Sequence, residues 1–505
     1  MQDKEEIFEE KTPTHLVQIH TGHDVLSPPS EKQPVDVNLV TFLLPTDSEN
    51  PKDWSTTRKW VITLILSATG FNRIMVSTIM APVLPVIAKD FHMTDIESLM
   101  SMSAYLLSTA IVPLIFAPLS EIYGRGIILH TTNIWFLLWN IVCGFVRNKQ
   151  GLIAARALAG FGAGAAYFLG TSVLGDLWDA KHRGRSLGFT SVVQNLAAAV
   201  GPIVGAIIAG RTNWRWIFWS TSIFQATITI ASLLAFRETY APLILQRRAK
   251  HLRDTTANAQ LYSPLDKLCE NRTPMEILQR SLARPIKLLF LHPIVAIQAL
   301  LSAFSYGITY LIVTTYSNIW TSRYGESIPT SGLHYIAMCI GGIIGAQIGG
   351  CLMELIFRHL NNKATTEQDK NKPEFHLPMM LPGTFFTVLG MLWYGWAAQY
   401  KIFWINVDIG AGVLAGGLIL IGMPLMAYII DVYPEHASSA QAASQMLRSL
   451  TAFAFPLFAP SMYAALGYGW ANTMLALISV LITLPAPIVI WIYGARLRRN
   501  ASDSF

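Results

Sequence analysis

The chain has 505 residues, of which 52% are hydrophobic and only 13% are charged, and its formal net charge is +6 at pH 7. Soluble domains carry about 25% charged residues, whereas here whole stretches such as 127–146 and 216–236 contain no Lys, Arg, Asp or Glu. This composition excludes an ordinary soluble enzyme and a nucleic-acid-binding protein. The four cysteines fit neither a disulfide framework nor a metal-binding spacing, which excludes a secreted disulfide scaffold.

The first 55 residues are polar and punctuated by proline, without an apolar run long enough for a signal peptide. We expect them to form a disordered cytoplasmic tail. Twelve apolar runs follow, and each is long enough to cross a membrane as a helix of about 20 residues. The runs are 60–80, 99–119, 127–146, 151–173, 187–210, 216–236, 293–318, 333–353, 377–400, 402–430, 440–466 and 470–493.

The longest interval between runs, 237–292, divides them into six and six. Its end, 274–290, has apolar and basic residues at helical spacing, which predicts either an amphipathic helix on the cytoplasmic face or a solvated linker helix. The sequence thus predicts an all-α integral membrane protein with twelve transmembrane helices in two six-helix pseudo-repeats. Its expected parts are a tail (1–55), a first bundle (56–236), a cytoplasmic loop (237–292), a second bundle (293–493) and a cytoplasmic tail (494–505).

The distribution of Lys and Arg predicts the orientation. Of 37 such residues, 27 lie in the tails and in the loops on one side of the expected membrane, and seven lie on the other side. Positive charge collects on the cytoplasmic side of membrane proteins, so both termini are expected to be cytoplasmic, in the plasma membrane. The basic excess is therefore a signal of topology, and no nucleic-acid partner is expected.

The two halves carry related segments at corresponding places. APLSEIYGR (117–125) closes the second run and GCLMELIFR (350–358) closes the eighth, and both have Leu, Glu and Arg at the third, fifth and ninth positions. Asp176 after the fourth run is matched by Asp431 after the tenth. Paired six-helix halves are typical of transporters that rock around a central site.

These segments resemble the major facilitator superfamily, and within it the drug:proton antiporters of fungi. The loop 117–126 is similar to the superfamily signature between the second and third helices, although Ala117 and Gly126 depart from it. The resemblance to the fungal branch extends over 50–60, 238–245 and 431–498. It implies the twelve-helix major facilitator fold and export of drugs or secondary metabolites. Further matching positions are Arg156 and Gly160 in the fourth run, and Gly188, Ala197, Gly201, Pro202, Gly205 and Ala206 in the fifth.

Several motif residues are expected to serve conformational change. Glu121 and Arg125 can latch neighbouring helix ends in one conformation, or can form a solvated charged turn. Gly201-Pro202 is expected to bend the fifth helix, because proline removes a backbone donor. The full set is Glu121, Gly124, Arg125, Gly160, Asp176, Arg183, Gly188, Gly201, Pro202, Gly205, Glu354, Arg358 and Asp431.

Ionisable residues inside spans are candidates for a pathway because each costs roughly 2.5–3.5 kcal/mol to insert. Arg73 lies 13 residues beyond Trp60 in the first run and is expected to face an anionic or strongly polar cargo. The alternative is a structural partner within the bundle. The expected pathway residues are Arg73, Arg156, Gln194, Asn195, Gln298, Tyr306, Tyr310, Asp408, Gln445 and Arg448.

Asp408 is the candidate proton carrier, because arginine does not titrate. We expect it at a depth similar to that of Arg156, so that the two charges interact directly or through water. The competing interpretation places Asp408 in the headgroup layer as a solvated helix-end charge.

The sequence predicts a secondary transporter for proton-coupled efflux of a drug-like or secondary-metabolite molecule, without cofactor or metal. It contains no GxxxxGK[ST] phosphate loop, which disfavours direct use of ATP. Proton-coupled uptake of a nutrient or organic acid is the alternative, and a polytopic membrane enzyme is disfavoured because the histidines lie at span ends or in loops. The expected partners are a small organic substrate, protons and the lipid bilayer, with the protein acting as a monomer.

Overall fold

The computed structural model describes residues 38–43, 46–256, 258–269, 274–363, 372–433 and 437–502. Helices dominate this part, in which the only β-contact is an isolated bridge between Leu39 and Tyr262. Eleven helical segments of the described chain are long and apolar enough to cross a membrane.

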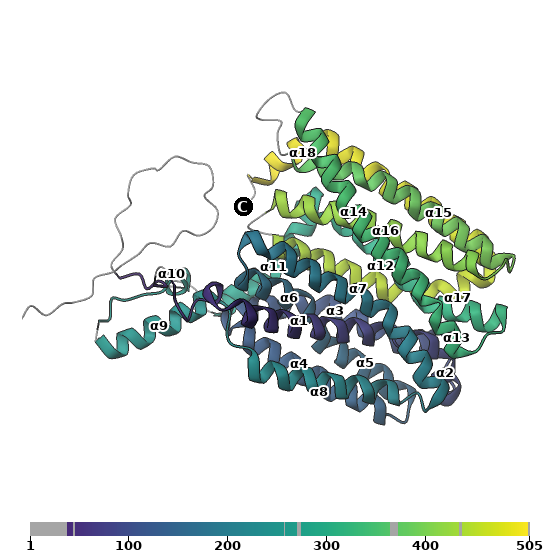
Figure 1. The fold of residues 1–505 in the computed structure, drawn as a ribbon, viewed down its shortest axis with the longest axis horizontal. Helices are drawn as coiled ribbons and strands as arrows, with labels where there is room; N and C mark the ends of the chain where they lie inside the picture. The colour runs from purple at the N-terminus through teal and green to yellow at the C-terminus, as the bar shows by residue number, and fades with distance from the viewer. Residues whose placement is uncertain are drawn as a thin grey trace, which may run out of the picture.

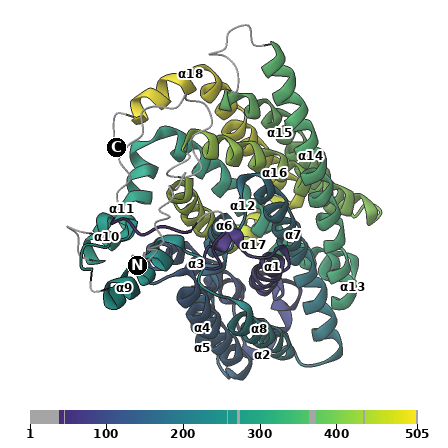
Figure 2. The same cartoon turned by 60° about the vertical axis from the view of Figure 1, so that its left-hand side comes forward.

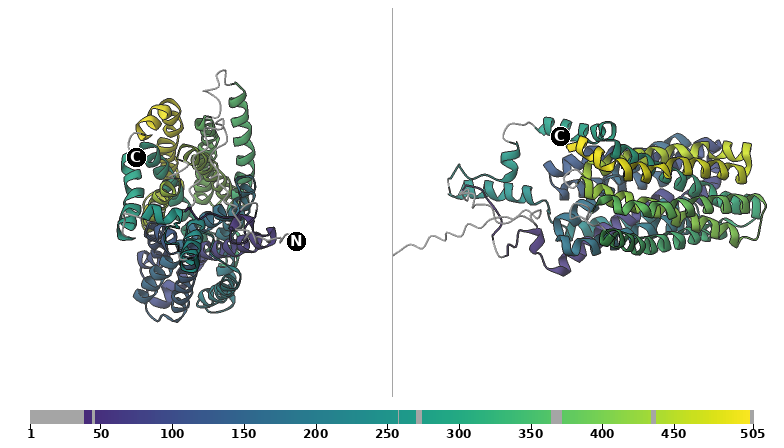
Figure 3. Two further views of the ribbon diagram at one scale, coloured as in Figure 1. Left: turned by 90° about the vertical axis from the view of Figure 1, so that its left-hand side faces the viewer. Right: turned by 90° about the horizontal axis from the view of Figure 1, so that it is seen from above.

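Two bundles lie side by side in Figure 1, the first coloured purple to teal and the second green to yellow. The left panel of Figure 3 also shows the two bundles as separate groups of helices. The first bundle contains α1 (Thr56–Thr78), α2 (Leu84–Phe91), α3 (Asp95–Ile122), α4 (Arg125–Phe145), α5 (Lys149–Ala163), α6 (Ala165–Leu177), α7 (Ala180–Arg211) and α8 (Trp216–Ala235). The second contains α12 (Pro293–Asn318), α13 (Ile328–Leu333), α14 (Tyr335–Lys363), α15 (Met380–Gln399), α16 (Ile405–Val432), α17 (Ala437–Thr483) and α18 (Pro485–Ser502).

The last of the eleven segments, Ser439–Gly494, contains two spans. Its backbone turns at Gly467, where φ is +71°, a conformation that glycine adopts without steric cost. Tyr468 beyond the turn donates its backbone N–H to the side chain of Gln399 at one end of α15. Thr483 then bonds to Thr384 near the other end of α15, so the chain has run back along it. The part of the chain that the structure describes therefore has twelve spans, as the sequence predicts.

The described residues of the central loop form three helices: α9 (Ala241–Thr256), α10 (Pro264–Cys269) and α11 (Pro274–Leu291). Figure 2 shows them together on one side of the molecule. The expected amphipathic segment is the helix α11, which contacts α3 of the first bundle as well as α12 and α17 of the second. The loop thus touches both bundles.

The N-terminal segment is ordered over a longer stretch than the expected disordered tail allows. Residues 46–54 include a short 3-10 helix, η1 (Pro51–Asp53), and Asp47 pairs with Arg248 of α9. Hydrogen bonds to α9 and to the following loop therefore hold this segment. The rest of the expected tail, 1–37 and 44–45, lies outside the described residues.

The apolar core differs between the two ends of the bundles. At the end that the Lys and Arg distribution predicts to be outside, called the outer end below, one cluster joins both bundles and includes Val76, Ile79, Ile312 and Tyr316. At the opposite end, which the same distribution predicts to be cytoplasmic and which is called the cytoplasmic end below, each bundle has a separate cluster of its own. The bundles are therefore packed together at the outer end and have divided cores at the cytoplasmic end.

Candidate functional site

A chain of three titratable side chains lies at the outer end of the second bundle. Nδ1 of His334 is 2.8 Å from Oδ2 of Asp408, and Nε2 of the same ring is 2.9 Å from Oε2 of Glu326. The hydroxyl of Tyr316 donates to Oδ1 of Asp408 over 2.6 Å. The side chains of His334 and Asp408 are only 9% and 12% exposed. We call Glu326, His334 and Asp408 the outer triad.

Local structure explains how the triad is held. His334 is the C-cap of α13, a short helix whose N-cap Ser327 accepts a hydrogen bond from the backbone N–H of Thr330. Asp408 lies in the first turn of α16, where the helix dipole favours a negative charge. The indole of Trp320 stacks on the imidazole of His334, with ring centroids 3.6 Å apart and planes inclined by 7°. Both nitrogens of the imidazole are therefore aimed at carboxylates.

The helix that carries His334 also packs against the first bundle. A Cβ on Gly332 would lie 2.4 Å from the Cβ of Ala206 and 3.2 Å from the carbonyl oxygen of Pro202, both on α7. A Cβ on Gly210 of α7 would lie 2.2 Å from Pro329 of α13. The outer triad is thus next to the contact that closes the outer end between the bundles.

A second group of polar side chains joins the bundles near the middle of the spans. The rings of Tyr306 and Tyr310 are 5.3 Å apart, and the guanidinium of Arg448 lies 4.2 Å from the ring centre of Tyr306. The hydroxyl of Tyr310 is 2.9 Å from that of Ser77 on α1. Arg448 is half-buried, and no carboxylate of the described residues forms an ion pair with it.

The neighbouring polar residues extend this group unevenly. Gln445 donates to Ser449 over 3.0 Å, and the hydroxyl of Ser449 is 2.9 Å from that of Thr109 on α3. Gln298 is buried and bonds within α12, Gln194 packs beside Gly70 of α1, and Asn195 is exposed. The structure therefore brings Tyr306, Tyr310 and Arg448 into contact, with Gln445 one turn before Ser449 on the helix that carries Arg448. Within the described chain, no hydrogen bond joins Gln298, Gln194 or Asn195 to them.

Arg73 and Arg156 lie within the first bundle. Arg73 donates to Oδ1 of Asn133 over 2.6 Å and stacks on Phe136, both on α4. Arg156 donates to the carbonyl oxygens of Ser101 and Val76, over 3.3 and 3.2 Å. Arg73 is 1% exposed and Arg156 is fully buried. These contacts link neighbouring helices of one bundle.

The hydrogen-bond partners of Arg156 and Asp408 contradict the expected charge interaction between the two residues. The carboxylate of Asp408 receives its hydrogen bonds from His334 and Tyr316, whereas Arg156 donates to backbone carbonyls of another bundle. The expectation of a solvated helix-end charge is also corrected, because Asp408 is 9% exposed. The physical reason is the short loop before α13, which folds His334 over the start of α16.

At the cytoplasmic end, Arg125 pairs with Asp176 over 3.4 Å and so joins α4 to α6. Glu238 accepts hydrogen bonds from the backbone N–H groups of Arg125 and Gly126 at the first turn of α4. Gly124 has φ +103°, and a Cβ there would lie 2.3 Å from Oε2 of Glu238. Arg125, rather than Glu121, is therefore the centre of this contact, and the side chain of Glu121 is exposed.

The second bundle repeats the contact with different residues. Oδ2 of Asp431 is 3.1 Å from Nε2 of His376, which lies in the 3-10 helix η5 (Pro373–Met379) before α15. Glu354 and Arg358 form an exposed pair within α14, with 62% and 71% of their side chains accessible. The structural counterpart of Arg125 is thus His376, and Glu354 and Arg358 do not latch two helices in this structure.

The small residues of the motifs separate into two kinds. A Cβ on Gly160 would lie 2.2 Å from the carbonyl oxygen of Tyr105, and one on Gly205 would lie 2.1 Å from that of Ile79. Gly201 likewise approaches the backbone of α1, next to Pro202 in α7. Gly188 has no atom within 4 Å of such a Cβ. Arg183 donates to the carbonyl oxygen of Gly175 over 3.2 Å.

The family model described as Major Facilitator Superfamily matches residues 66–456. The chain belongs to this superfamily. The match includes the Arg125–Asp176 contact and the whole outer triad.

Fungal members of the superfamily are similar over nearly the whole chain. A protein of Aspergillus flavus named as a probable efflux pump is 48% identical, over 84% of this chain and all of the relative. A transporter of Schizosaccharomyces pombe is 39% identical over 92% of this chain and 94% of its own. An efflux pump of Penicillium aethiopicum is 37% identical over 92% and 91%.

Solved transporter structures share the fold. The xylose transporter of E. coli, in a partially occluded inward-open conformation, covers 87% of this chain and 98% of its own with a TM-score of 0.63. A bacterial homologue of the lysosomal transporter Spinster, in an inward-facing conformation, has a TM-score of 0.59. Their sequence identities of 14% and 13% carry the likeness of fold alone.

Sequence reasoning missed His334, Glu326, His376 and Glu238. The two histidines lie at the end of a span and in a loop, where a catalytic group inside the membrane is not expected. One signal was present for His334, since the eighth and tenth runs of a major facilitator bundle are neighbours. Their outer ends carry His334 and Asp408, so a contact between the two could have been proposed from topology.

Proposed function

We propose that the protein exports a small organic molecule of drug-like or secondary-metabolite type across the plasma membrane, by alternating access and with protons as the driving ion. The fungal relatives named as efflux pumps support this direction of transport. The divided core supports alternating access. Joined packing at the outer end with separate cores at the cytoplasmic end is one of the two arrangements that such a cycle requires.

The outer triad is the observation that carries proton coupling. An imidazole has two N–H groups only when it is protonated. Both nitrogens of His334 lie within hydrogen-bond distance of a carboxylate oxygen, so the two bonds need one proton more than a neutral imidazole provides. Either the imidazole or one of the carboxyl groups holds that proton. The geometry is therefore that of a proton-loaded site.

The position of the triad links proton binding to closure of the outer end. Without the extra proton, two carboxylates face a neutral ring, and one hydrogen bond is lost in a poorly solvated place. That loss destabilises the placement of α13, whose Gly332 packs on Pro202 and Ala206 of α7. A proton taken up from outside thus favours closure of the outer end, which is the uptake step of a proton-driven exporter.

Other titratable side chains surround the triad and contribute to its electrostatic environment. Tyr316 donates to Asp408, and Arg323 donates to the carbonyl oxygens of Ala398 and Gln399. Tyr324, Tyr335 and Tyr394 complete the surroundings from η3 (Ile319–Tyr324), α14 and α15. Tyrosine hydroxyls remain protonated at physiological pH, so the triad is the group that exchanges protons there.

The group around Arg448 suits an aromatic cargo with negative charge. Tyr306 and Tyr310 offer ring faces, and Arg448 offers a guanidinium without an acidic partner among the described residues. Arg73 and Arg156 are engaged within the first bundle, so Arg448 is the arginine that we assign to the cargo.

The test uses the full chain in sealed liposomes, with carboxyfluorescein as an anionic aromatic probe and rhodamine 6G as a cationic one. An imposed proton gradient should drive probe against its concentration gradient, and a protonophore should stop it. We expect faster movement of carboxyfluorescein, and loss of the pH dependence in the His334→Asn variant.

Glu354→Gln is the matched control, because that carboxylate is exposed and far along the chain from the triad. Uphill movement of probe in the same direction as protons would replace export by uptake. Movement that is unaffected by the gradient would overturn proton coupling.

A further inference from the structure

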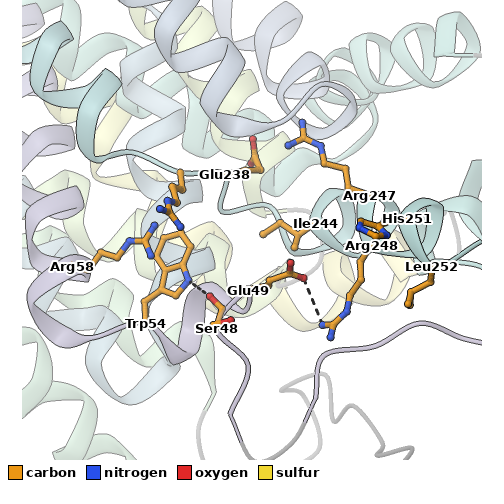
Figure 4. Close-up of a pocket in the computed structure, with 11 residues that line it drawn as sticks. Ser48, Glu49, Trp54, Arg58, Glu238, Ile244, Arg247, Arg248, His251 and Leu252 are labelled. Carbon is orange, nitrogen blue, oxygen red and sulfur yellow. Dashed lines mark hydrogen bonds and ion pairs between the residues drawn. The ribbon is translucent and has the colours of Figure 1, made fainter. Parts of the chain in front are cut away.

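A pocket of about 500 Å³ lies at the cytoplasmic end of the first bundle (Figure 4). Four parts of the chain form it: the N-terminal segment, the first turn of α1, the residues after α8, and α9. Arg58 is the third residue of α1, and Arg237 is the second residue after α8, so the pocket is at the level where these helices begin and end. Its lining residues are Ser48, Glu49, Trp54, Arg58, Arg237, Glu238, Ile244, Arg247, Arg248, His251 and Leu252.

The acidic residues of the pocket are already engaged. The carboxylate of Glu238 accepts four backbone hydrogen bonds, two from the start of α4 and two from Thr239 and Tyr240. Glu49 lies 3.7 Å from Arg248, which also pairs with Asp47 over 2.5 Å. Burial alone raises the pKa of Asp47, but hydrogen bonds from the backbone of Leu43 and Glu49 and from Arg248 hold it below its usual value. Arg248 is therefore kept in place by its own carboxylates.

Three guanidinium groups of the pocket have no counterion among the residues that the structure describes. Within the described chain, no carboxylate lies within 4 Å of the guanidinium nitrogens of Arg58, Arg237 or Arg247. Arg58 is held 3.8 Å over the ring of Trp54, and Figure 4 shows it on the wall opposite Arg247 and His251. Like charges gathered around one pocket repel each other unless an anion lies between them.

The chemistry of these groups identifies the anion. The planar fork of arginine matches phosphate oxygens with two parallel hydrogen bonds. A basic pocket beside transmembrane helices on the cytoplasmic side is suited to anionic headgroups, and Trp54, Ile244 and Leu252 add apolar wall beside the charges. We propose that this pocket binds a phosphate monoester, presented either by an anionic lipid of the inner leaflet or by a soluble phosphorylated metabolite. Such a ligand would join the N-terminal segment and α9 to the first span.

The experiment measures binding to the full chain in phosphatidylcholine nanodiscs, with two probes that share the phosphate monoester. Dioctanoyl phosphatidic acid represents the lipid source, and glycerol 3-phosphate represents the soluble source. The pocket variant is Arg58→Gln, Arg237→Gln, Arg247→Gln. The matched control removes the same charge at exposed positions outside the pocket, with Lys52→Gln, Arg211→Gln, Lys250→Gln.

We expect saturable binding that is weakened at least about tenfold in the pocket variant and less than about twofold in the control, since truncating close charge pairs has effects of that size. Binding of phosphatidic acid alone assigns the site to a lipid, and binding of both probes assigns it to the phosphate group itself. Equal losses in the two variants, or no binding of either probe, overturn the proposal. Because no transport is measured, this result is independent of the proposed export.

Discussion

The indole of Trp320 and the imidazole of His334 lie ring on ring, 3.6 Å apart and nearly parallel. An aromatic face stabilises a cation that lies against it, by about 2 kcal/mol where water is excluded. The stack thus favours the protonated form of the ring that bridges Glu326 and Asp408.

Trp320→Phe should shift the external pH of half-maximal export to more acid values, by about half a unit to one unit, because one unit corresponds to about 1.4 kcal/mol. The shift is acidic because a weaker stack stabilises the bound proton less. Trp404→Phe is the control, since the rings of Trp404 and His334 are inclined by 72° with centroids 5.7 Å apart and do not stack. The measurement is the pH profile of probe export, and equal shifts in both variants would count against the stack.

His334→Asn and Asp408→Asn should each abolish the pH dependence of export while cargo still binds. The double variant should behave like either single one, because both residues hold the same proton and their effects are coupled. Export rates across a pH series, analysed as a double-mutant cycle, measure this coupling. Additive losses would place the proton at two independent sites.

Arg448→Gln should lower transport of carboxyfluorescein several-fold without changing thermal stability, because Arg448 is half-buried beside Tyr306.

Arg156→Gln should lower the melting temperature, because the carbonyl oxygens of Ser101 and Val76 lose their donor at roughly 1–3 kcal/mol for each buried group left unpaired. Melting curves of the purified variants separate the two roles. An unchanged melting temperature for Arg156→Gln would contradict a structural role.

Gly205→Ala should destabilise the first bundle by about 1–3 kcal/mol, the usual cost of overpacking. Its new methyl would lie 2.1 Å from the carbonyl oxygen of Ile79, so α7 must move away from α1. Gly188→Ala is the matched control on the same helix, where no atom lies within 4 Å. Yield of folded protein and melting temperature report the difference, and equal behaviour of the two variants would refute the close contact.

Asp176→Asn should change the rate of transport several-fold, because it removes the only carboxylate that pairs with Arg125 in the described chain. Glu354→Gln should leave the rate unchanged, since exposed pairs within a helix contribute about 0.3–0.5 kcal/mol. Initial rates with saturating carboxyfluorescein test both. A larger effect of Glu354→Gln would restore the latch that the repeated sequence suggests.

The fold could be predicted from the sequence because it depends mainly on features that are read along the chain. Twelve apolar runs, the Lys and Arg distribution and the repeated Asp176 and Asp431 predict twelve spans in two halves. The expected run 293–318 has the same bounds as α12, and the turn at Gly467 falls between the expected runs 440–466 and 470–493.

The site was less predictable because its partners are set by packing across helices. Tyr306 and Tyr310 share a helix face by their spacing alone. The partner of Asp408 depends instead on how a short helix folds the chain back over α16, which no periodicity encodes. Depth along a helix suggested Arg156 for that partner, but depth does not say which way a side chain points.

The helix α11 has a mechanical consequence for the transport cycle. Its Leu288 and Leu289 belong to the core of the second bundle, while the same helix contacts α3 of the first. We therefore expect α11 to move with the second bundle while it packs against the first. Widening the cytoplasmic mouth must slide or break the α11–α3 contact, so the strength of that contact limits how far the mouth opens before cargo enters.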